Sequence, residues 1–403
     1  MAMEKKKILF IYPSMLLGGS TTSLLAFFNS LDPQKYQIDL QLQGNGGPLF
    51  DSIPSNVNVL PEAKKYKGKM AKFIRFSRMF FQGAFFKSLF VGMKNKKGRC
   101  SNDVINEFWA KHLSKPNDNH YDYAISFLEG WGSNYLAYRI NADKKYAWIH
   151  STFSKTTDDP KGQLKWIDKV NKVVFVTDAC KREFEELLPE AKEKGVTVEN
   201  IIDSEILRKR AEQEDATDEA FENFKKSNCT KIITVCRVVI DVKGLDRVVA
   251  AAAALRDSGV EFLWYVVGDG ADLPALTSMI ENAGLKDMLV PIGRRDNPYP
   301  FIKAADIMCM PSRYEGKPMV ITESQILGTV PIVTEYLSAN DQIKSGVDGV
   351  VVPNGDDSII APLLELASDK DAIMAIRQNL LSRDYGNREY IHVIEKELFE
   401  GIL

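Results

Sequence analysis

The chain has 403 residues, of which 45% are hydrophobic, and this is enough for two domains of ordinary size, each with its own core. A formal net charge of −2 gives no electrostatic argument for nucleic-acid binding. Five scattered cysteines without a C-x-x-C pair predict reduced thiols in a cytoplasmic protein, and the four histidines lack metal-ligand spacing. No apolar run reaches the roughly 18 residues that a membrane-spanning helix needs.

The N-terminal residues 1–19 imitate a signal peptide, because basic residues precede an apolar run. Pro13 interrupts that run, however, and no small-residue cleavage pattern follows it. We therefore interpret residues 6–12 as the first strand of a parallel sheet, covered on both faces.

A glycine turn follows this first strand. Gly18 and Gly19 precede a helical pattern, and Ser20 or Thr21 is expected to cap the helix. Turns of this kind, between the first strand and the first helix of an α/β sheet, are places where phosphate or substrate binds, although many are only tight connections.

Strand and helix patterns alternate through the rest of the first half. Such alternation favours a doubly wound sheet with helices on both faces. His150 ends one strand pattern and Glu129 follows another, so both are expected at the carboxyl edge of the sheet, where ligands bind. For His150 a purely structural role is the alternative, and Glu129 has no motif behind it. The further strand patterns cover residues 36–43, 57–60, 121–128, 145–150 and 172–177.

Residues 61–100 are strongly basic. They contain twelve Lys/Arg and one acid, Glu62, so their charge is +11 and that of the remaining chain is −13. A basic amphipathic helix with aromatic residues on its apolar side suits the headgroup region of an anionic membrane. The equal alternative is a helical insertion whose phenylalanines pack on the domain core, with nucleic-acid binding a distant third. The phenylalanines are Phe73, Phe76, Phe80, Phe81, Phe85, Phe86 and Phe90.

A second α/β series follows a polar stretch that ends near Asn228. It includes the alanine-rich helical run 245–259 and predicts another doubly wound sheet of about six strands. Clefts between two such domains are common ligand sites. The strand patterns cover 231–238, 261–268, 288–293, 306–311, 330–334 and 349–353, and the expected domains are 1–200 with an insertion at 61–115, 201–384, and a C-terminal helix 385–403 returning to the first domain.

The stretch SRYEGKPMVITES (312–324) links a buried-strand run, 305–311, to a helical run, 320–327. A strand-to-helix turn presents backbone N–H groups and the positive end of a helix dipole, which suits a phosphate. Two acids, Glu315 and Glu323, lie across this turn. The alternative is a surface turn with two solvated glutamates.

The E-x7-E spacing of Glu315 and Glu323 resembles the signature of the family 4 retaining glycosyltransferases. Further stretches match that family in the same order, namely NIID at 200–203 and the stretches 236–249, 266–276 and 292–307. The resemblance implies the GT-B fold, with two Rossmann-like domains facing each other across a cleft, and a role in bacterial cell-envelope polysaccharide synthesis. The chain departs from the family at EGKPM, where members often have EGFGL, so Lys317 and Pro318 alter the loop.

The resemblance also implies roles for individual residues. Arg237 and Lys243 would face the leaving diphosphate, Glu323 the ribose, Glu315 the sugar, and His150 the sugar's outer hydroxyls. Glu129 is a weaker candidate for facing the acceptor, on its position alone and not on the resemblance. The remaining nucleotide-binding residues would be Gly18, Gly19, Gly268, Arg294, Lys317, Pro318, Met319 and Val320, with the backbone after Gly293 holding the base.

The implied reaction moves a sugar from a nucleotide diphosphate, most simply a UDP-sugar, to a glycan or lipid-linked acceptor at the inner face of the membrane. It would retain anomeric configuration and require neither a metal nor a cofactor, since fixed cations can stabilise the leaving phosphate. We interpret the lone D-x-D, Asp369–Asp371, as a helix start. The alternatives are a nucleotide-sugar epimerase or hydrolase of GT-B-like fold and a non-catalytic partner protein.

Overall fold

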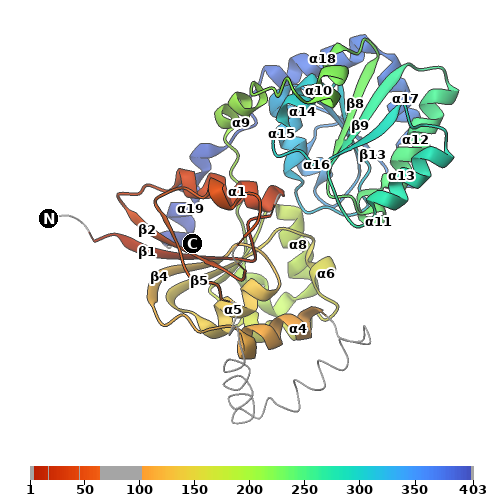
Figure 1. The fold of residues 1–403 in the computed structure, drawn as a ribbon. Helices are drawn as coiled ribbons and strands as arrows, with labels where there is room; N and C mark the ends of the chain where they lie inside the picture. The colour runs from red at the N-terminus through yellow and green to blue at the C-terminus, as the bar shows by residue number, and fades with distance from the viewer. Residues whose placement is uncertain (1–3, 17, 45, 64–101, 401–403) are drawn as a thin grey trace, which may run out of the picture. The chain divides into compact units, whose positions relative to one another are not determined.

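The structure is a computed structural model that describes residues 4–16, 18–44, 46–63 and 102–400 (Figure 1). The chain divides into two compact units. Unit 1 comprises Met1–Ile201 and Glu389–Leu403, and unit 2 comprises Ile202–Arg388. The chain thus crosses between the units inside the NIID stretch, and its C-terminal segment belongs to unit 1.

Unit 1 is built on a parallel sheet whose described strands run in the order β3-β2-β1-β4-β5-β6-β7. The chain moves outward from β1 through β2 to β3, and then continues on the other side of β1 with β4. The neighbouring carboxyl ends of β1 and β4 are therefore the topological switch point, where doubly wound sheets bind ligands. The strands are β1 (Lys6–Tyr12), β2 (Tyr36–Leu42), β3 (Val57–Val59), β4 (His120–Ser126), β5 (Asn141–Ile149), β6 (Lys172–Phe175) and β7 (Gly195–Thr197).

Alternate residues of β1 pack on opposite faces of this sheet, because successive side chains of a strand point to opposite sides. Phe10 packs with α1 (Gly19–Ser30), whereas Leu9 belongs to the core that includes α5 (Trp131–Arg139) and α8 (Asp178–Leu187). The C-terminal helices α19 (Ile391–Ile394) and η6 (Glu395–Phe399) cover the α1 face. There, the Tyr123 hydroxyl donates to the Phe399 carbonyl oxygen at 2.8 Å.

Unit 2 contains a second parallel sheet, with the order β10-β9-β8-β11-β12-β13. Its switch point lies between β8 and β11, which pair directly. Helices α12 (Leu245–Asp257), α13 (Leu273–Asn282) and α17 (Ile360–Ser368) cover one face, while α9 (Ser204–Ala211), α10 (Glu219–Lys226), α14 (Tyr299–Ala304) and α15 (Met319–Leu327) cover the other. The strands are β8 (Thr230–Val235), β9 (Phe262–Val267), β10 (Leu289–Gly293), β11 (Ile307–Met310), β12 (Val330–Thr334) and β13 (Val350–Val352).

Two doubly wound sheets are what the alternating pattern predicts, and the interpretation of residues 6–12 as a strand is confirmed by β1. The D-x-D interpretation is also confirmed, because Asp369 caps α18 (Lys370–Leu381) and accepts from the Ala372 N–H at 2.9 Å. The expected cap of α1 is wrong. Gly18 occupies the cap position, and Ser20 and Thr21 lie inside the helix and hydrogen-bond the Tyr12 hydroxyl.

The basic stretch 61–100 lies outside the described residues, apart from 61–63, so its predicted contact with a membrane stays a prediction. The described chain resumes with α4 (Asn102–Phe108) and a short π-helix, η2 (Trp109–Leu113). None of the helices that the structure describes is long and apolar enough to cross a bilayer.

Candidate functional site

The two cations and two acids predicted in the second half all lie in unit 2 near the carboxyl edge of its sheet. Lys243 ends the short helix α11 (Ile240–Lys243), which follows β8, and Glu315 lies on the loop after β11. Their side chains form an ion pair of 2.6 Å, and both are largely buried. The strand order thus brings a lysine and a glutamate that are 72 residues apart in sequence together at the switch point.

Gly244 allows this close approach. Its φ of 62° is left-handed, and a Cβ at this position would overlap the carbonyl oxygen of Pro311, at the end of the β11 run. Glycine tolerates both conditions because it has no side chain. The backbone that carries Lys243 can therefore lie directly against the loop that carries Glu315.

Two arginines that sequence reasoning missed connect the loops at this edge. The buried Arg247 donates to the Pro311 carbonyl oxygen, Asn354 and Asp356. Arg313 makes a two-pronged contact with Asp246, at 2.8 and 2.7 Å. Both arginines lie within stretches that resemble the family, 236–249 and 312–324, which could have marked them as close to the site. Their partners depend on the order of the strands in the sheet.

The turn before α15 is supported from the β12 side. The Ser338 hydroxyl donates to the Gly316 carbonyl oxygen, and the Gln342 amide donates to the Pro318 carbonyl oxygen at 3.0 Å. Pro318 is the cap residue, so Met319 and Val320 form the first turn of α15. Lys317 is half-buried beside them. The amides at this helix start and the positive end of its dipole can bind an anion.

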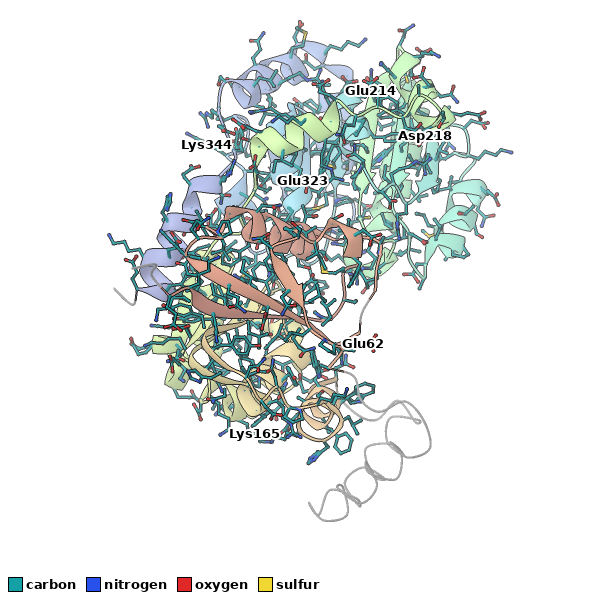
Figure 2. All side chains as sticks on the ribbon, turned by 60° about the vertical axis from the view of Figure 1, so that its left-hand side comes forward. Glu62, Lys165, Glu214, Asp218, Glu323 and Lys344 are labelled. Carbon is teal, nitrogen blue, oxygen red and sulfur yellow. The ribbon has the colours of Figure 1, made fainter. Side chains whose placement is uncertain are left out.

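Glu323 is buried inside unit 2, in the second turn of α15 (Figure 2). Its Oε1 accepts from the Tyr299 hydroxyl at 3.2 Å, and the Arg210 guanidinium lies 4.7 Å from the centre of the Tyr299 ring. Burial raises the pKa of Glu323 to about 7, although the Tyr299 hydrogen bond and the Arg210 charge oppose the rise. Glu323 is thus a carboxyl whose charge changes near neutral pH.

Arg237 lies on the loop between β8 and α11, and its side chain is exposed. None of the residues that the structure describes forms an ion pair with it. The glycine turn 268–270 packs directly on this loop, because a Cβ on Gly268 or Gly270 would overlap the carbonyl oxygen of Cys236 or Val238, respectively. Gly268 therefore has a packing role that would require glycine whether or not it also contacts a ligand.

Arg294 follows β10 and makes an exposed ion pair of 2.8 Å with Asp296. It also lines a cavity of about 510 Å³ between α10 and the loop that precedes α14. Gly293 has a φ of 73°, and its carbonyl oxygen accepts from the Gly268 N–H at 3.0 Å. The predicted base-binding stretch is thus joined by a backbone hydrogen bond to the glycine turn.

The predicted residues of unit 1 lie at the carboxyl edge of their own sheet. Gly18 and Gly19 follow β1 and begin α1, Glu129 follows β4, and His150 follows β5. The Glu129 carboxylate accepts from the His150 backbone N–H at 3.0 Å and from the Ser151 hydroxyl at 2.8 Å. Burial lowers the pKa of the His150 imidazole, while the Glu129 charge and the Phe127 backbone raise it.

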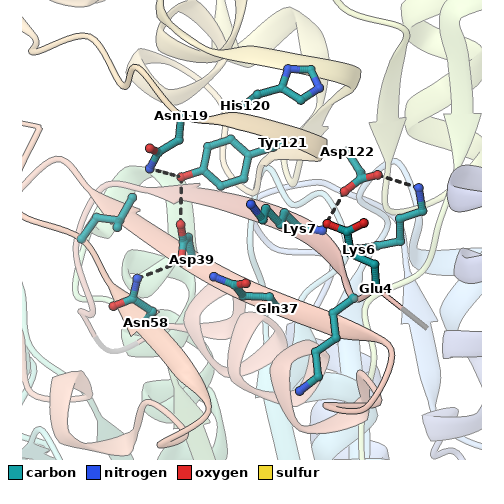
Figure 3. A pocket seen from close by; sticks show the side chains of 12 residues that line it. Glu4, Lys6, Lys7, Gln37, Asp39, Asn58, Asn119, His120, Tyr121 and Asp122 are labelled. Atoms are coloured by element: carbon teal, nitrogen blue, oxygen red, sulfur yellow. Dashed lines mark hydrogen bonds and ion pairs between the residues drawn. The ribbon is translucent and has the colours of Figure 1, made fainter. Parts of the chain in front are cut away.

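A separate cavity of about 590 Å³ lies at the opposite, amino edge of this sheet (Figure 3). At its floor, buried Asp39 accepts from Asn58 at 2.8 Å and from the Tyr121 hydroxyl at 2.9 Å (Figure 3). None of the predicted functional residues lines this cavity. The hydrogen bonds of Asp39 join β2, β3 and β4, which gives this polar cluster a structural role.

The fold and the site together define a protein of the GT-B architecture. The structure of HepE from Anabaena in complex with UDP-glucose superposes with a TM-score of 0.71 at 15% identity, over 98% of this chain and 100% of that one. The lipopolysaccharide glycosyltransferase WaaG superposes with a TM-score of 0.65 over 96% of this chain and 99% of that one, at 14% identity. At such identities the likeness concerns the fold, and it confirms the predicted class.

Residues 215–381, most of unit 2, match the family model of the glycosyl transferases group 1, so this unit carries the domain of that family. An α-D-kanosaminyltransferase of Streptomyces kanamyceticus is 24% identical over 225 residues, 54% of this chain and 57% of the relative. A UDP-Gal:α-D-GlcNAc-diphosphoundecaprenol α-1,3-galactosyltransferase of Escherichia coli is 32% identical over 110 residues, 27% of this chain and 28% of the relative. The chain therefore aligns with about half or less of the length of these two relatives, and the matches confirm the predicted family resemblance.

Proposed function

We propose that the protein is a retaining glycosyltransferase that moves a sugar from a nucleotide diphosphate to a glycan or lipid-linked acceptor in cell-surface polysaccharide synthesis. The observation that carries the proposal is the Lys243–Glu315 pair at the β8/β11 switch point, beside exposed Arg237 and the N-terminus of α15. A UDP-sugar is the favoured donor, since HepE binds UDP-glucose and the Escherichia coli relative is a UDP-Gal galactosyltransferase.

In the proposed reaction, the bond between the anomeric carbon and the diphosphate oxygen breaks, and a bond to the acceptor oxygen forms on the same face. The acceptor proton passes to the leaving phosphate. Negative charge builds on that phosphate, and Lys243, Arg237 and the amides of Met319 and Val320 would stabilise it. Preorganised cations and dipoles of this kind replace the metal ion that other transferases use.

Glu315 holds the Lys243 ammonium at the switch point before the donor binds, so less reorganisation is needed when the diphosphate arrives. Glu323 would accept hydrogen bonds from the ribose hydroxyls, and His150 from the sugar. These assignments follow the family resemblance, and they agree with the carboxyl-edge position of each residue.

The test is binding and turnover with purified protein. A panel of nucleotide sugars is first screened by thermal shift, and the stabilising donor is then incubated with a lipid-linked monosaccharide while UDP release and the anomeric proton signal of the product are followed. We expect acceptor-dependent release and a product with the donor's configuration. Binding of no nucleotide sugar, or turnover that does not depend on the acceptor, would overturn the proposal.

We further propose that residues 61–100 bring the protein to an anionic membrane that holds a lipid-linked acceptor. The support is the sequence alone, a charge of +11 interleaved with seven phenylalanines. Each basic residue near such a surface contributes about 1 kcal/mol, and salt screens the attraction. We expect co-sedimentation with anionic vesicles that weakens sharply at high salt, whereas equal, negligible pelleting with anionic and neutral vesicles would end the proposal.

A further inference from the structure

Glu129 uses both of its carboxylate oxygens on one loop. Oε2 accepts from the His150 backbone N–H, and Oε1 accepts from the Ser151 hydroxyl. The two residues directly follow β5, the strand that pairs with β4, which leads into Glu129. Glu129 thus holds the first two residues of the β5 loop at the carboxyl edge of the sheet.

The His150 imidazole is held in place from a second side. Its ring centroid lies 4.9 Å from that of Phe127, which is buried and precedes Glu129 by two residues. The Nε2 atom is buried and has no hydrogen-bond partner within the described part of the chain. Leaving a buried polar atom without a partner is unfavourable, so the free Nε2 favours a partner that arrives with the ligand.

We propose that Glu129 is a positioning residue, which fixes the β5 loop so that Nε2 of His150 meets a hydroxyl of the bound sugar or acceptor. The proposal rests on the proposed function. It differs from direct contact between Glu129 and the acceptor, because both carboxylate oxygens already bind protein groups. The Glu129 charge also raises the pKa of the His150 ring, against the lowering that burial causes.

The neighbouring loop offers a matched control. Glu183 on α8 likewise accepts from one backbone N–H, at 3.4 Å, and one hydroxyl, at 2.6 Å, both of Ser154 in the short helix α6 (Phe153–Thr156) that follows the loop. Truncating Glu183 therefore removes an equivalent pair of hydrogen bonds without touching His150. The loss of a generic loop contact can thus be separated from the loss of His150 positioning.

The experiment is a double-mutant cycle with Glu129→Ala and His150→Ala, measured as kcat and as KM for the donor. Misplacement of a reacting group by about 1 Å can cost on the order of 10²-fold in rate. We expect Glu129→Ala to lower kcat by about that factor in the wild type and to have less than about a twofold effect in the His150→Ala background. Glu183→Ala should change kcat by less than about twofold. Independent, multiplicative losses would overturn the proposal.

A second readout does not need activity. The His150 imidazole signal is followed by NMR across pH in the full-length protein and assigned by its loss in His150→Gln. Glu129→Ala should move the signal and its titration midpoint, and Glu183→Ala should not; an unmoved signal in Glu129→Ala would overturn the proposal. Glu129→Gln, which keeps an acceptor for the His150 N–H and can donate to Ser151, should lower the midpoint and retain most of kcat. If the wild type transfers no sugar, the proposed function fails, while the NMR comparison still decides whether Glu129 positions His150.

Discussion

The carboxyl edges of the two sheets have the same topology but carry different chemistry. In unit 2 the edge presents Lys243 and Arg237, with Glu315 paired to the lysine. In unit 1 it presents His150, whose pKa is lowered by burial, and Glu129, whose two carboxylate oxygens accept hydrogen bonds from the loop after β5. The first edge suits a diphosphate and the second suits hydroxyl groups. Strand order places a site, whereas the side chains decide what it binds.

The two edges also differ in how their loops are held. Unit 2 uses charged contacts, in which Arg313 and Arg247 connect three loops through Asp246, Asp356 and the Pro311 carbonyl oxygen. Unit 1 holds the first two residues after β5 through Glu129, a carboxylate that accepts from neutral donors. We call these contacts of Arg247 and Arg313 the frame of the site. A cationic site gains from such a frame, because charges fixed in advance stabilise a leaving phosphate without reorganisation.

The largest expected effect comes from removing the cations of unit 2. Replacing Lys243 or Arg237 with alanine should lower kcat by about 10²–10³-fold, the range typical for losing one group that stabilises transition-state charge. The fold should survive, as judged by circular dichroism and thermal unfolding. Lys303→Ala, which removes an exposed ion pair with Glu212 in the same unit, is the control and should act like wild type. Near-normal kcat values in both site variants would contradict the assignment of the diphosphate site to the carboxyl edge of the unit 2 sheet.

The second effect concerns the ionisation of Glu323. Its folded pKa of about 7 exceeds its ordinary value of 4.5, so its contribution to stability is complete below pH 4.5 and is lost as pH rises through 7. The loss amounts to about 3 kcal/mol. The ionised form is the better acceptor for ribose hydroxyls, so UDP affinity should rise as pH approaches 7, by at most about tenfold per pH unit.

Calorimetric titration with UDP between pH 5.5 and 8, combined with denaturant unfolding at each pH, measures both consequences. Glu323→Gln should flatten the two pH profiles, because it keeps an acceptor for Tyr299 and cannot ionise. Glu212→Gln, an exposed substitution, should leave them unchanged. UDP affinity without any pH dependence in this range would contradict the role of Glu323.

A smaller effect is expected from the frame around the cations. Arg313→Ala should lower the free energy of unfolding by about 2 kcal/mol, the usual scale for losing a hydrogen bond to a charged group. It should also lower kcat by about tenfold, since the Lys243 and Glu315 loops lose a connection. Denaturant unfolding and steady-state kinetics test both effects. A stability loss with unchanged kcat would show that the frame serves folding alone.

The smallest effect should come from chelation. Because fixed cations are proposed to stabilise the leaving phosphate, EDTA should leave the rate within about twofold of its value without chelator. The control is added MgCl₂ at matched ionic strength, which separates a specific metal effect from salt screening. A strict requirement for a divalent ion would contradict the proposed chemistry.

The sequence by itself determined the strands, their alternation with helices and the order of the motifs. Buried parallel strands appear as continuous apolar runs, so β1 and β12 coincide with their predicted ranges 6–12 and 330–334. It also placed Lys243, Glu315 and His150 at strand ends, since a residue that follows a strand must lie at the carboxyl edge. Local signals were less secure at helix starts, where Gly18 rather than Ser20 caps α1.

Only the tertiary structure decided which of these residues meet. Glu129 binds the backbone of His150, Lys243 pairs with Glu315, and Glu323 accepts from Tyr299. Each contact joins separate elements, and it depends on which strands are neighbours, on where each helix packs and on the rotamers that burial permits. Periodicity reports which face of an element is apolar but carries no information about its partner. Likewise, the raised pKa of Glu323 follows from its burial, which the sequence does not reveal for a glutamate in the second turn of a helix.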